Sequence, residues 1–274
     1  IAGIAESEQR PATVAGREWA ARAYPDHAYG RPVGGSMKTI PTIDKADLAA
    51  FAKTRFARGN LVMAIVGDID AAEVVRLVSG AFAPLPEKAN LTPVADVAAT
   101  PPAGILVIDR PIPQSNVVFG LPGINRDDPD WYPALEKRGR AYSVSTGLAP
   151  EEHSGLLIGS VGTQNERAKE SIDLIRAEVA KMQESGITAE ELEAAKKYLT
   201  GSYPLTFSTS PRIAAQLVAM QLEGFSPAYL DQRNGYIEAV TLEQVNAVAK
   251  RLLKADALSW VVVGRPAGVS STME

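Results

Sequence analysis

Two histidines, His27 and His153, are the side chains of this sequence best suited to bind a metal or to accept a proton. They stand 126 positions apart, and the sequence contains no cysteine. A catalytic zinc ion takes about three protein ligands and keeps an open position for water. Ser143 and Ser145 have no histidine nearby in the sequence to act as a base. These counts predict neither a self-sufficient zinc hydrolase nor a serine hydrolase.

Each histidine also has a purely structural explanation. His27 stands between Tyr24 and Tyr29, and we expect it to pack against these tyrosines in a loop. For His153 we expect a solvated side chain at the start of a strand. The three tryptophans lie in apolar patterns and are expected in the core. They are Trp19, Trp131 and Trp260.

The composition is that of a folded protein with one large domain or two ordinary ones. It has 274 residues, 46% of them apolar, and a net charge of −4 with scattered Lys and Arg. Nucleic-acid binding requires clustered positive charge, so it is not expected. No run approaches the roughly 18 apolar residues of a membrane span. A cysteine-free chain suits the cytosol or the periplasm, so the compartment stays open. Because the sequence opens on Ile1 instead of Met, we expect that residues precede it in the natural protein.

An internal repeat at an offset of 197 residues organises the chain. Residues 43–67 and 240–264 both contain a polar N-cap, a stretch of helical periodicity and an apolar run that ends at glycine. Asp44 and Thr241 fit the N-cap positions, and Gln244 completes a capping box in the second copy. Each copy therefore predicts a helix, a short polar turn and a buried strand, at 61–66 and 258–263. The copies share identical residues at Ala50/Ala247, Ala52/Ala249, Lys53/Lys250, Leu61/Leu258, Val66/Val263 and Gly67/Gly264.

A proline-rich stretch, residues 84–103, lies between the two copies and has the composition of an extended linker. After it, apolar runs predict strands, and helical spacing with capping signals then predicts a series of helices before the last strand. The predicted strands are 104–108, 116–119, 140–148 and 155–163. The predicted helices are one that Gly186 ends, one that Thr188 caps, and 211–223, 227–240 and 241–253.

These elements predict an α+β fold of two repeated domains, each a mostly antiparallel sheet with helices packed on one face. At the repeat offset, the opening strands of the first domain would precede residue 1, so we expect the first domain to be incomplete. The expected boundaries are 1–83 for the C-terminal part of the first domain, 84–103 for the linker and 104–274 for the second domain.

Four blocks, in order over nearly the whole chain, resemble the pitrilysin/insulinase-type zinc peptidases. The likeness is greatest to short bacterial members and to mitochondrial processing-peptidase subunits. The blocks are residues 24–35 (YPDHAYGRPVGG), 44–68, 114–118 (QSNVV) and 136–145 (EKRGRAYSVS).

The resemblance implies that catalytic members bind zinc through an H-x-x-E-H helix and a glutamate further along. This sequence has no such motif, because Ala149 stands four residues before His153. The resemblance places the second-motif glutamate ligand near the start of this sequence. Residues 1–4 contain no carboxylate, and Glu6 and Glu8 lie a few positions after the expected place. The resemblance therefore predicts no catalytic residue, no metal ligand and no cofactor in this chain.

Tyr142 matches the tyrosine that holds substrate near the scissile bond in such enzymes. The arginine expected seven residues earlier is replaced by Leu135. Either a deletion between Asp127 and Glu136 removed it together with a glycine-rich loop, or the natural protein has a segment here that this sequence lacks. Packing on a strand face is the structural alternative for Tyr142.

Together these features predict the non-catalytic subunit of a heterodimeric zinc metallopeptidase. A homologous partner bearing H-x-x-E-H would hold the zinc, and this chain would form the opposite, substrate-binding wall and contact the peptide through Tyr142. Three alternatives stay open: a single-chain zinc peptidase whose H-x-x-E-H half lies outside this sequence, a structural or assembly protein on the same fold, and a stand-alone peptide-binding module.

Overall fold

The computed structural model describes residues 2–135, 140–141 and 144–273. The chain divides into two compact units. Unit 1 comprises residues 1–40, 95–196 and 239–274, and unit 2 comprises residues 41–94 and 197–238.

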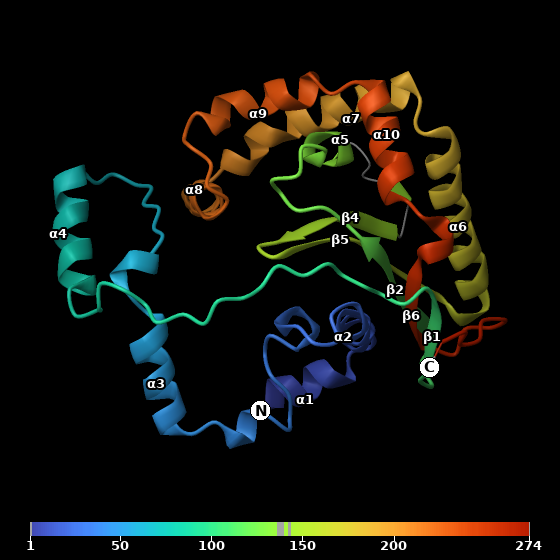
Figure 1. Cartoon of the computed structure of the whole chain (residues 1–274), viewed down its shortest axis with the longest axis horizontal. Helices are drawn as coiled ribbons and strands as arrows, with labels where there is room; N and C mark the ends of the chain where they lie inside the picture. Colours follow the sequence, from blue (N-terminus) through green and yellow to red (C-terminus); the bar gives the residue numbers. More distant parts are fainter. Residues whose placement is uncertain (1, 136–139, 142–143, 274) are drawn as a thin grey trace. The chain divides into compact units, whose positions relative to one another are not determined.

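Unit 1 is built on a mixed sheet, which has six strands among the described residues (Figure 1). Its order is β1-β6-β2-β5-β4-β3, with β1 and β6 parallel and every other neighbouring pair antiparallel. The predicted α+β class is confirmed, and so are the strands predicted at 104–108, 116–119 and 155–163. The single strand predicted at 140–148 is wrong, because this range contributes to two strands, β3 and β4, that pair with each other. The strands are β1 (Gly104–Asp109), β2 (Gln114–Pro122), β3 (Arg140–Ala141), β4 (Val144–Glu151), β5 (Ser154–Gln164) and β6 (Ser259–Gly264).

The central strand β6 is buried on both faces, so its side chains alternate between two apolar clusters. Trp260 and Val262 point to the cluster that contains Ile172 of α6 (Ala168–Ser185). Val261 and Val263 point to the opposite cluster, built around Trp19 of α2 (Pro11–Ala23). Trp19 also donates its indole N–H to the carbonyl of Ser259, at 3.2 Å. The sheet thus has α6 on one face and α2 on the other.

Local signals set the ends of the helices in unit 1. Gly186, at φ 71°, ends α6, and Thr188 and Glu191 bond reciprocally at the start of α7 (Ala189–Ser202). Thr241 and Gln244 form the predicted capping box of α10 (Leu242–Leu252), which contacts α6 and α5 (Trp131–Leu135). The first helix is α1 (Ala2–Gln9).

Unit 2 consists of helices and the segments that connect them, and its described residues form no strand. It contains α3 (Lys45–Arg55), α4 (Ala71–Phe82), α8 (Ser210–Leu222) and α9 (Tyr229–Glu238). The stacked rings of Phe225 and Tyr229, 4.1 Å apart, and the guanidinium of Arg233 over the ring of Tyr203 hold the second segment together. The short 3₁₀ helices of the chain are η1 (Ala28–Gly30), η2 (Ile40–Thr42), η3 (Arg58–Asn60), η4 (Asn165–Arg167), η5 (Tyr203–Phe207) and η6 (Ala255–Ala257).

The strand predicted at 61–66 is wrong for this structure. The segment has no strand assignment, and Leu61 and Ile65 stay exposed. A strand exists only when a neighbour accepts and donates its backbone hydrogen bonds, and the described part of unit 2 contains no other strand. No helix within residues 2–135, 140–141 and 144–273 combines the length and the apolar character that crossing a membrane requires.

Candidate functional site

Tyr142, the residue predicted to contact substrate, lies outside the described residues. The strands on either side of it, β3 and β4, are described and pair antiparallel. Arg140 pairs with Ser145, and Ala141 with Val144. Leu135 is the last residue of α5. The role of Tyr142 therefore stays a prediction.

A cavity of about 650 Å³ lies in unit 1, where β2 ends and β5 begins. Four separate segments of the chain line it. The first belongs to the proline-rich stretch, the second follows β2, the third is the turn between β4 and β5, and the fourth is the end of α10. They comprise residues 96–99, 122–125 with 127–129, 153–155 and 251–252. Because strand ends and a linker meet here, the cavity exposes loop side chains instead of core ones.

His153 forms one wall of this cavity. Its Nδ1 lies 2.9 Å from Oδ1 of Asp96, and its backbone N–H donates to the hydroxyl of Tyr29 at 3.0 Å. Its carbonyl accepts from the N–H of Val97 at 2.9 Å. The side chain is only 23% exposed. His153 lies directly before β5, as predicted, but its side chain is only partly solvated, because the end of the linker packs over the β4–β5 turn.

Arg251, in the last turn of α10, brings a positive charge to the opposite wall. Its Nη2 lies 3.0 Å from Oδ1 of Asp128 and 2.7 Å from Oδ2 of Asp130. Both carboxylates precede α5, so this cation ties α10 to the segment that follows β2. The pairs are partly exposed, and an exposed pair contributes little more than about 1 kcal/mol. Their main effect is to fix the position of the cavity wall.

Tyr24 and Ser154 lie beneath this region and are almost fully buried. The hydroxyl of Tyr24 donates to Oγ of Ser154 at 2.8 Å. Burial raises the pKa of Tyr24 above its ordinary value, and the hydrogen bond to Ser154 offsets part of that increase. Ser154 thus bonds to a phenol, while the neighbouring His153 ring bonds to Asp96. The two are not arranged as a nucleophile and its base.

The structure brings the two histidines, distant in sequence, to the same tyrosine. The ring of His27 lies 4.6 Å from that of Tyr29 and 6.2 Å from that of Tyr24. Its Nδ1 accepts the backbone N–H of Tyr29 at 3.3 Å. The predicted packing of His27 between two tyrosines is confirmed.

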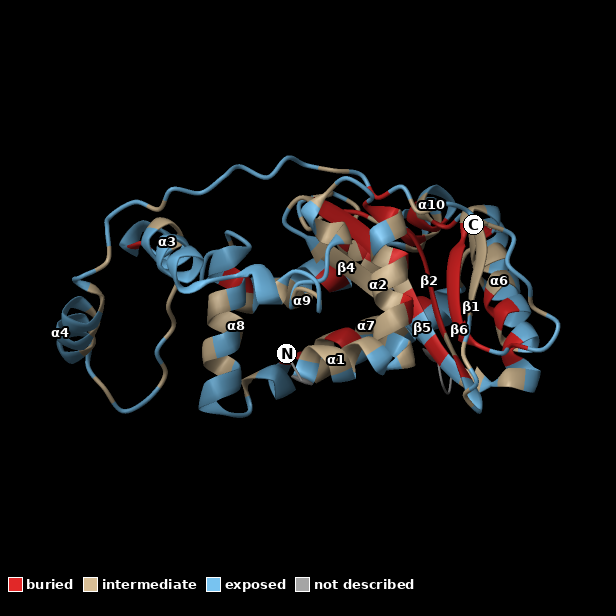
Figure 2. Ribbon diagram, turned by 90° about the horizontal axis from the view of Figure 1, so that it is seen from below, coloured by how far each residue is buried: buried red, intermediate tan, exposed pale blue. Residues whose placement is uncertain are grey.

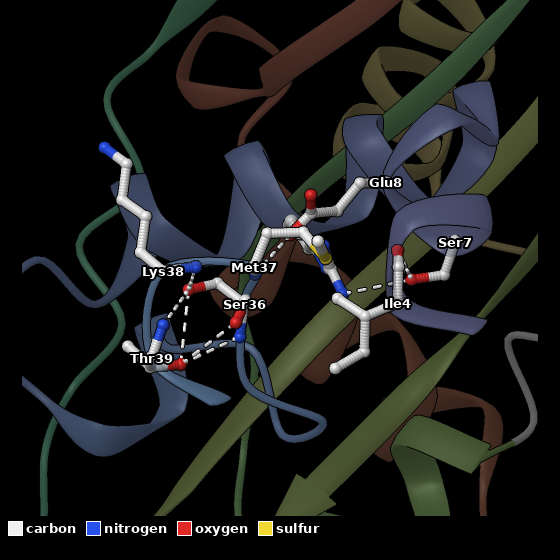
Figure 3. Close-up of polar contacts among 8 residues, drawn as sticks. Ile4, Ser7, Glu8, Ser36, Met37, Lys38 and Thr39 are labelled. Atoms are coloured by element: carbon white, nitrogen blue, oxygen red, sulfur yellow. Dashed lines mark hydrogen bonds and ion pairs between the residues drawn. The ribbon is translucent and has the colours of Figure 1, made fainter. Parts of the chain in front are cut away.

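The described residues do not fit a zinc ion. They contain no group of three or more His, Cys, Asp or Glu side chains that could hold a metal. Oε1 of Glu8 accepts the backbone N–H of Met37 at 3.3 Å (Figure 3). The same oxygen forms an ion pair with Nη1 of Arg17 at 3.5 Å. Glu6 pairs with Arg10 one turn away. The carboxylates of Glu6 and Glu8 therefore bind neighbouring helix and loop groups of this chain.

The described residues that line the cavity include no nucleophile hydrogen-bonded to a base. Among the described lining residues, most charged side chains already form pairs with each other, as in Asp96–His153 and Arg251–Asp128. Asp127 is exposed.

Sequence reasoning missed the residues that shape this cavity. Asp96, Asp128 and Arg251 come from three segments that meet only in the folded unit. None belongs to a short motif, so no local signal could have grouped them. The composition of residues 84–103 predicted a linker, but it did not predict that the end of this linker binds the β4–β5 turn.

Comparisons with protein families, with individual sequences and with solved structures all find peptidase-type proteins. A family model described as "Peptidase M16 inactive domain" matches residues 42–135 and 134–199. The two matched segments meet beside Leu135. An uncharacterized zinc protease of Streptomyces coelicolor is 26% identical over 91% of this chain and 60% of its own length. This chain spans about three fifths of the length of these curated relatives, which include proteins of Mycobacterium leprae and Mycobacterium bovis.

Solved structures resemble the whole chain. A peptidase M16 inactive domain from Pseudomonas fluorescens gives a TM-score of 0.86 at 28% identity, over 100% of this chain and 69% of that one. A protease from Helicobacter pylori gives a TM-score of 0.82 at 17% identity, over 96% of this chain and 70% of that one, a likeness of fold.

Proposed function

Because this chain belongs to the peptidase M16 inactive-domain family, we propose that it is the non-catalytic subunit of a heterodimeric zinc metallopeptidase. It would form the substrate-binding wall opposite the zinc site of a homologous partner that carries H-x-x-E-H. The partner's zinc would polarise the peptide carbonyl and activate water.

One observation carries this proposal: the chain belongs to a peptidase family, but its sequence lacks the residues that would bind a catalytic zinc ion. The whole sequence has two histidines and no cysteine, and its described residues hold no metal-binding group. Relatives named as zinc proteases support peptide hydrolysis as the process in which the family takes part. A chain of this family without ligands contributes best by binding and positioning the peptide.

Within this proposal Tyr142 contacts the substrate. A phenol can donate a hydrogen bond to the oxyanion that forms at the scissile carbonyl. Leu135 cannot replace the arginine that the family resemblance implies at its position, so Tyr142 would act without that second donor.

The test is a reconstitution. The chain is purified alone and together with the H-x-x-E-H homologue from the same source, and cleavage of an unfolded fluorogenic peptide is followed with and without zinc. We expect cleavage only by the pair. A variant of the partner whose motif glutamate is replaced by Gln controls for contaminating proteases. Zinc-dependent cleavage by the lone chain would contradict the proposal.

Tyr142→Phe separates a role in catalysis from a structural role. We expect the pair to assemble normally and its kcat to fall by about 100- to 1,000-fold, as when one oxyanion donor is removed. Tyr236→Phe is the matched control, because its hydroxyl donates to Gln232, one turn away on the same helix. An unchanged rate for Tyr142→Phe in an intact pair would favour a structural or assembly protein.

A second candidate is a single-chain peptidase whose H-x-x-E-H half lies outside this sequence. The lengths of the relatives favour it, since the chain covers 60% of the Streptomyces protein and 61% of the Mycobacterium leprae protein. The complete coding sequence decides between the candidates. An H-x-x-E-H motif in the same open reading frame supports the single-chain enzyme, and its presence only in a neighbouring gene supports the heterodimer.

A further inference from the structure

The outer edge of β1 is covered by the segment that follows β6. Among the described strands, β1 lies at one end of the sheet and has β6 as its only neighbouring strand. Residues 266–273, here called the strap, run back along the other side of β1, and Figure 1 shows the end of the chain beside this strand. Figure 2 shows that β1 is mostly half-buried, whereas β6 is buried throughout. The strap therefore stands between this edge of the sheet and the solvent.

The outward backbone groups of β1 bond to the strap instead of to another strand. Successive residues of a strand direct their N–H and C=O groups to opposite sides, and the N–H of Gly104 points toward β6. Ile105 and Val107 therefore point away from β6. The N–H of Ile105 donates to Oγ1 of Thr272 at 2.9 Å, and its carbonyl accepts the N–H of Thr272 at 2.8 Å. The N–H of Val107 donates to Oγ of Ser271 at 2.9 Å.

These contacts make the strap a cover that can open. Two of the bonds end at side-chain hydroxyls, and both Ser271 and Thr272 are exposed. An exposed hydrogen bond contributes little net free energy, because water replaces it when it breaks. The strap is fixed more firmly at its start, where the N–H of Ala267 donates to the carbonyl of Asn165 at 2.9 Å and Val269 packs against the buried cluster on the α6 face. Its outer residues can therefore leave β1 while its start stays in place.

The edge under the strap is suited to pair with a copy of itself. Charged residues and prolines on an edge strand discourage pairing with other chains, and residues 104–108 contain neither. An antiparallel pair of identical strands has a two-fold axis and closes as a dimer. With that axis at Leu106, Ile105 of each copy lies opposite Val107 of the other, and each such pair exchanges its backbone hydrogen bonds. The groups that bond to the strap in this structure would then bond to a strand.

We propose that the strap is a displaceable cover, and that its release lets β1 pair antiparallel with β1 of a second copy of this chain. Either residues 271–273 of the same chain or the second β1 occupies the edge, and never both, because the two use the same backbone groups of Ile105 and Val107. With the strap bound, this pair of copies cannot form. The inference rests on unit 1 alone and does not depend on the proposed function.

Two double variants test the strap. Ser271→Ala with Thr272→Pro removes both hydroxyls and the N–H of residue 272, whereas Ser271→Thr with Thr272→Ser keeps all three groups. In dilute solution we expect the first variant to exchange the amide hydrogens of Ile105 and Val107 at least about 10-fold faster than the parent chain. As its concentration rises, its mass in sedimentation equilibrium should double and this exchange should slow again. The second variant should stay a single copy, like the parent.

Three results would overturn the proposal. The first is a parent chain that already pairs through β1 with its strap bound. The second is a strap-released variant that stays a single copy at high concentration although its β1 amides exchange rapidly. The third is unchanged exchange at Ile105 and Val107 in that variant, because the strap would then not be what protects them.

A cysteine provides an independent readout of the register. The sequence contains no cysteine, so one substitution gives a unique thiol. In the proposed pair the Cα atoms of the two Leu106 residues lie about 4.5 Å apart, which suits a disulfide. In the strap-released variant, Leu106→Cys should form a covalent dimer at least about 10-fold faster than Leu174→Cys, which is exposed on α6 and measures random collision. Equal rates for the two cysteines would overturn the proposal, as would equally fast cross-linking of Leu106→Cys with the strap intact.

Discussion

The hydroxyl of Tyr24 donates a hydrogen bond to Oγ of Ser154, 2.8 Å away, and so joins the end of α2 to the first residue of β5. Both residues are at most 3% exposed. Replacing the phenol by Phe leaves a buried hydroxyl on Ser154 without this donor. We expect Tyr24→Phe to lower the free energy of unfolding by about 1–2 kcal/mol, measured by urea denaturation. Tyr236→Phe, at a side chain that is 44% exposed, should change it by less than about 0.5 kcal/mol.

The same tyrosine predicts a loss of stability in alkali. Burial raises the pKa of Tyr24, so the folded protein favours the neutral phenol more than the unfolded chain does. The contribution of the neutral phenol to the free energy of unfolding is complete below the ordinary tyrosine pKa of about 10. It is lost as the pH rises through the higher pKa of the folded state. Burial also raises the pKa of Tyr203, with Arg233 opposing it, so both residues contribute. Denaturation curves from pH 8 to 11 should show a smaller decline for Tyr24→Phe than for the parent chain.

The capping box of α10 predicts a local contribution to stability. Oγ1 of Thr241 accepts the N–H of Gln244, and Oε1 of Gln244 accepts the N–H of Thr241. Thr241→Ala removes the first bond and should cost about 1 kcal/mol in thermal or urea unfolding. Thr241→Ser keeps the hydroxyl and should retain most of the stability. If both variants lost the same amount, the cap would not be the cause.

Zinc is expected to have no effect on this chain alone. A ligand that binds only the folded state raises its stability in proportion to its affinity and concentration. Since the described residues hold no group that could take a metal, added zinc or EDTA should leave the melting temperature within about 1 °C. An H-x-x-E-H homologue, treated in parallel, should respond to both. A clear stabilisation of this chain by stoichiometric zinc would indicate ligands that the sequence count overlooked.

Short-range signals account for what could be predicted from the sequence. The caps at Thr188 and Thr241, the stop at Gly186 and the apolar run of β6 each act within a few residues, and each appears in the structure as expected. The segment 61–66 carries the same kind of run but forms no strand here, because strand formation depends on neighbours.

The cavity illustrates the same limit for a functional site. Arg251 and Asp128 are 123 positions apart, and His153 and Asp96 are 57 apart. Such pairs form only after the sheet has assembled, and none of the four belongs to a motif. By contrast, the expectation that this sequence holds no zinc site uses only a count of ligand types and their spacing.

The repeat also supplies a matched pair of glycines for the last prediction. Gly264 ends β6 at φ 150°, and a Cβ there would lie 2.7 Å from Oγ and 2.9 Å from Cα of Ser115. The equivalent Gly67 has no atom within 4 Å of such a Cβ, and its φ is not positive. Gly264→Ala should therefore lower the free energy of unfolding by about 2–4 kcal/mol through strain and overpacking, whereas Gly67→Ala should change it by less than about 1 kcal/mol. Urea denaturation of both variants checks the difference. Equal and small effects would mean that β6 and Ser115 can separate without loss, contrary to the close packing of the sheet described above.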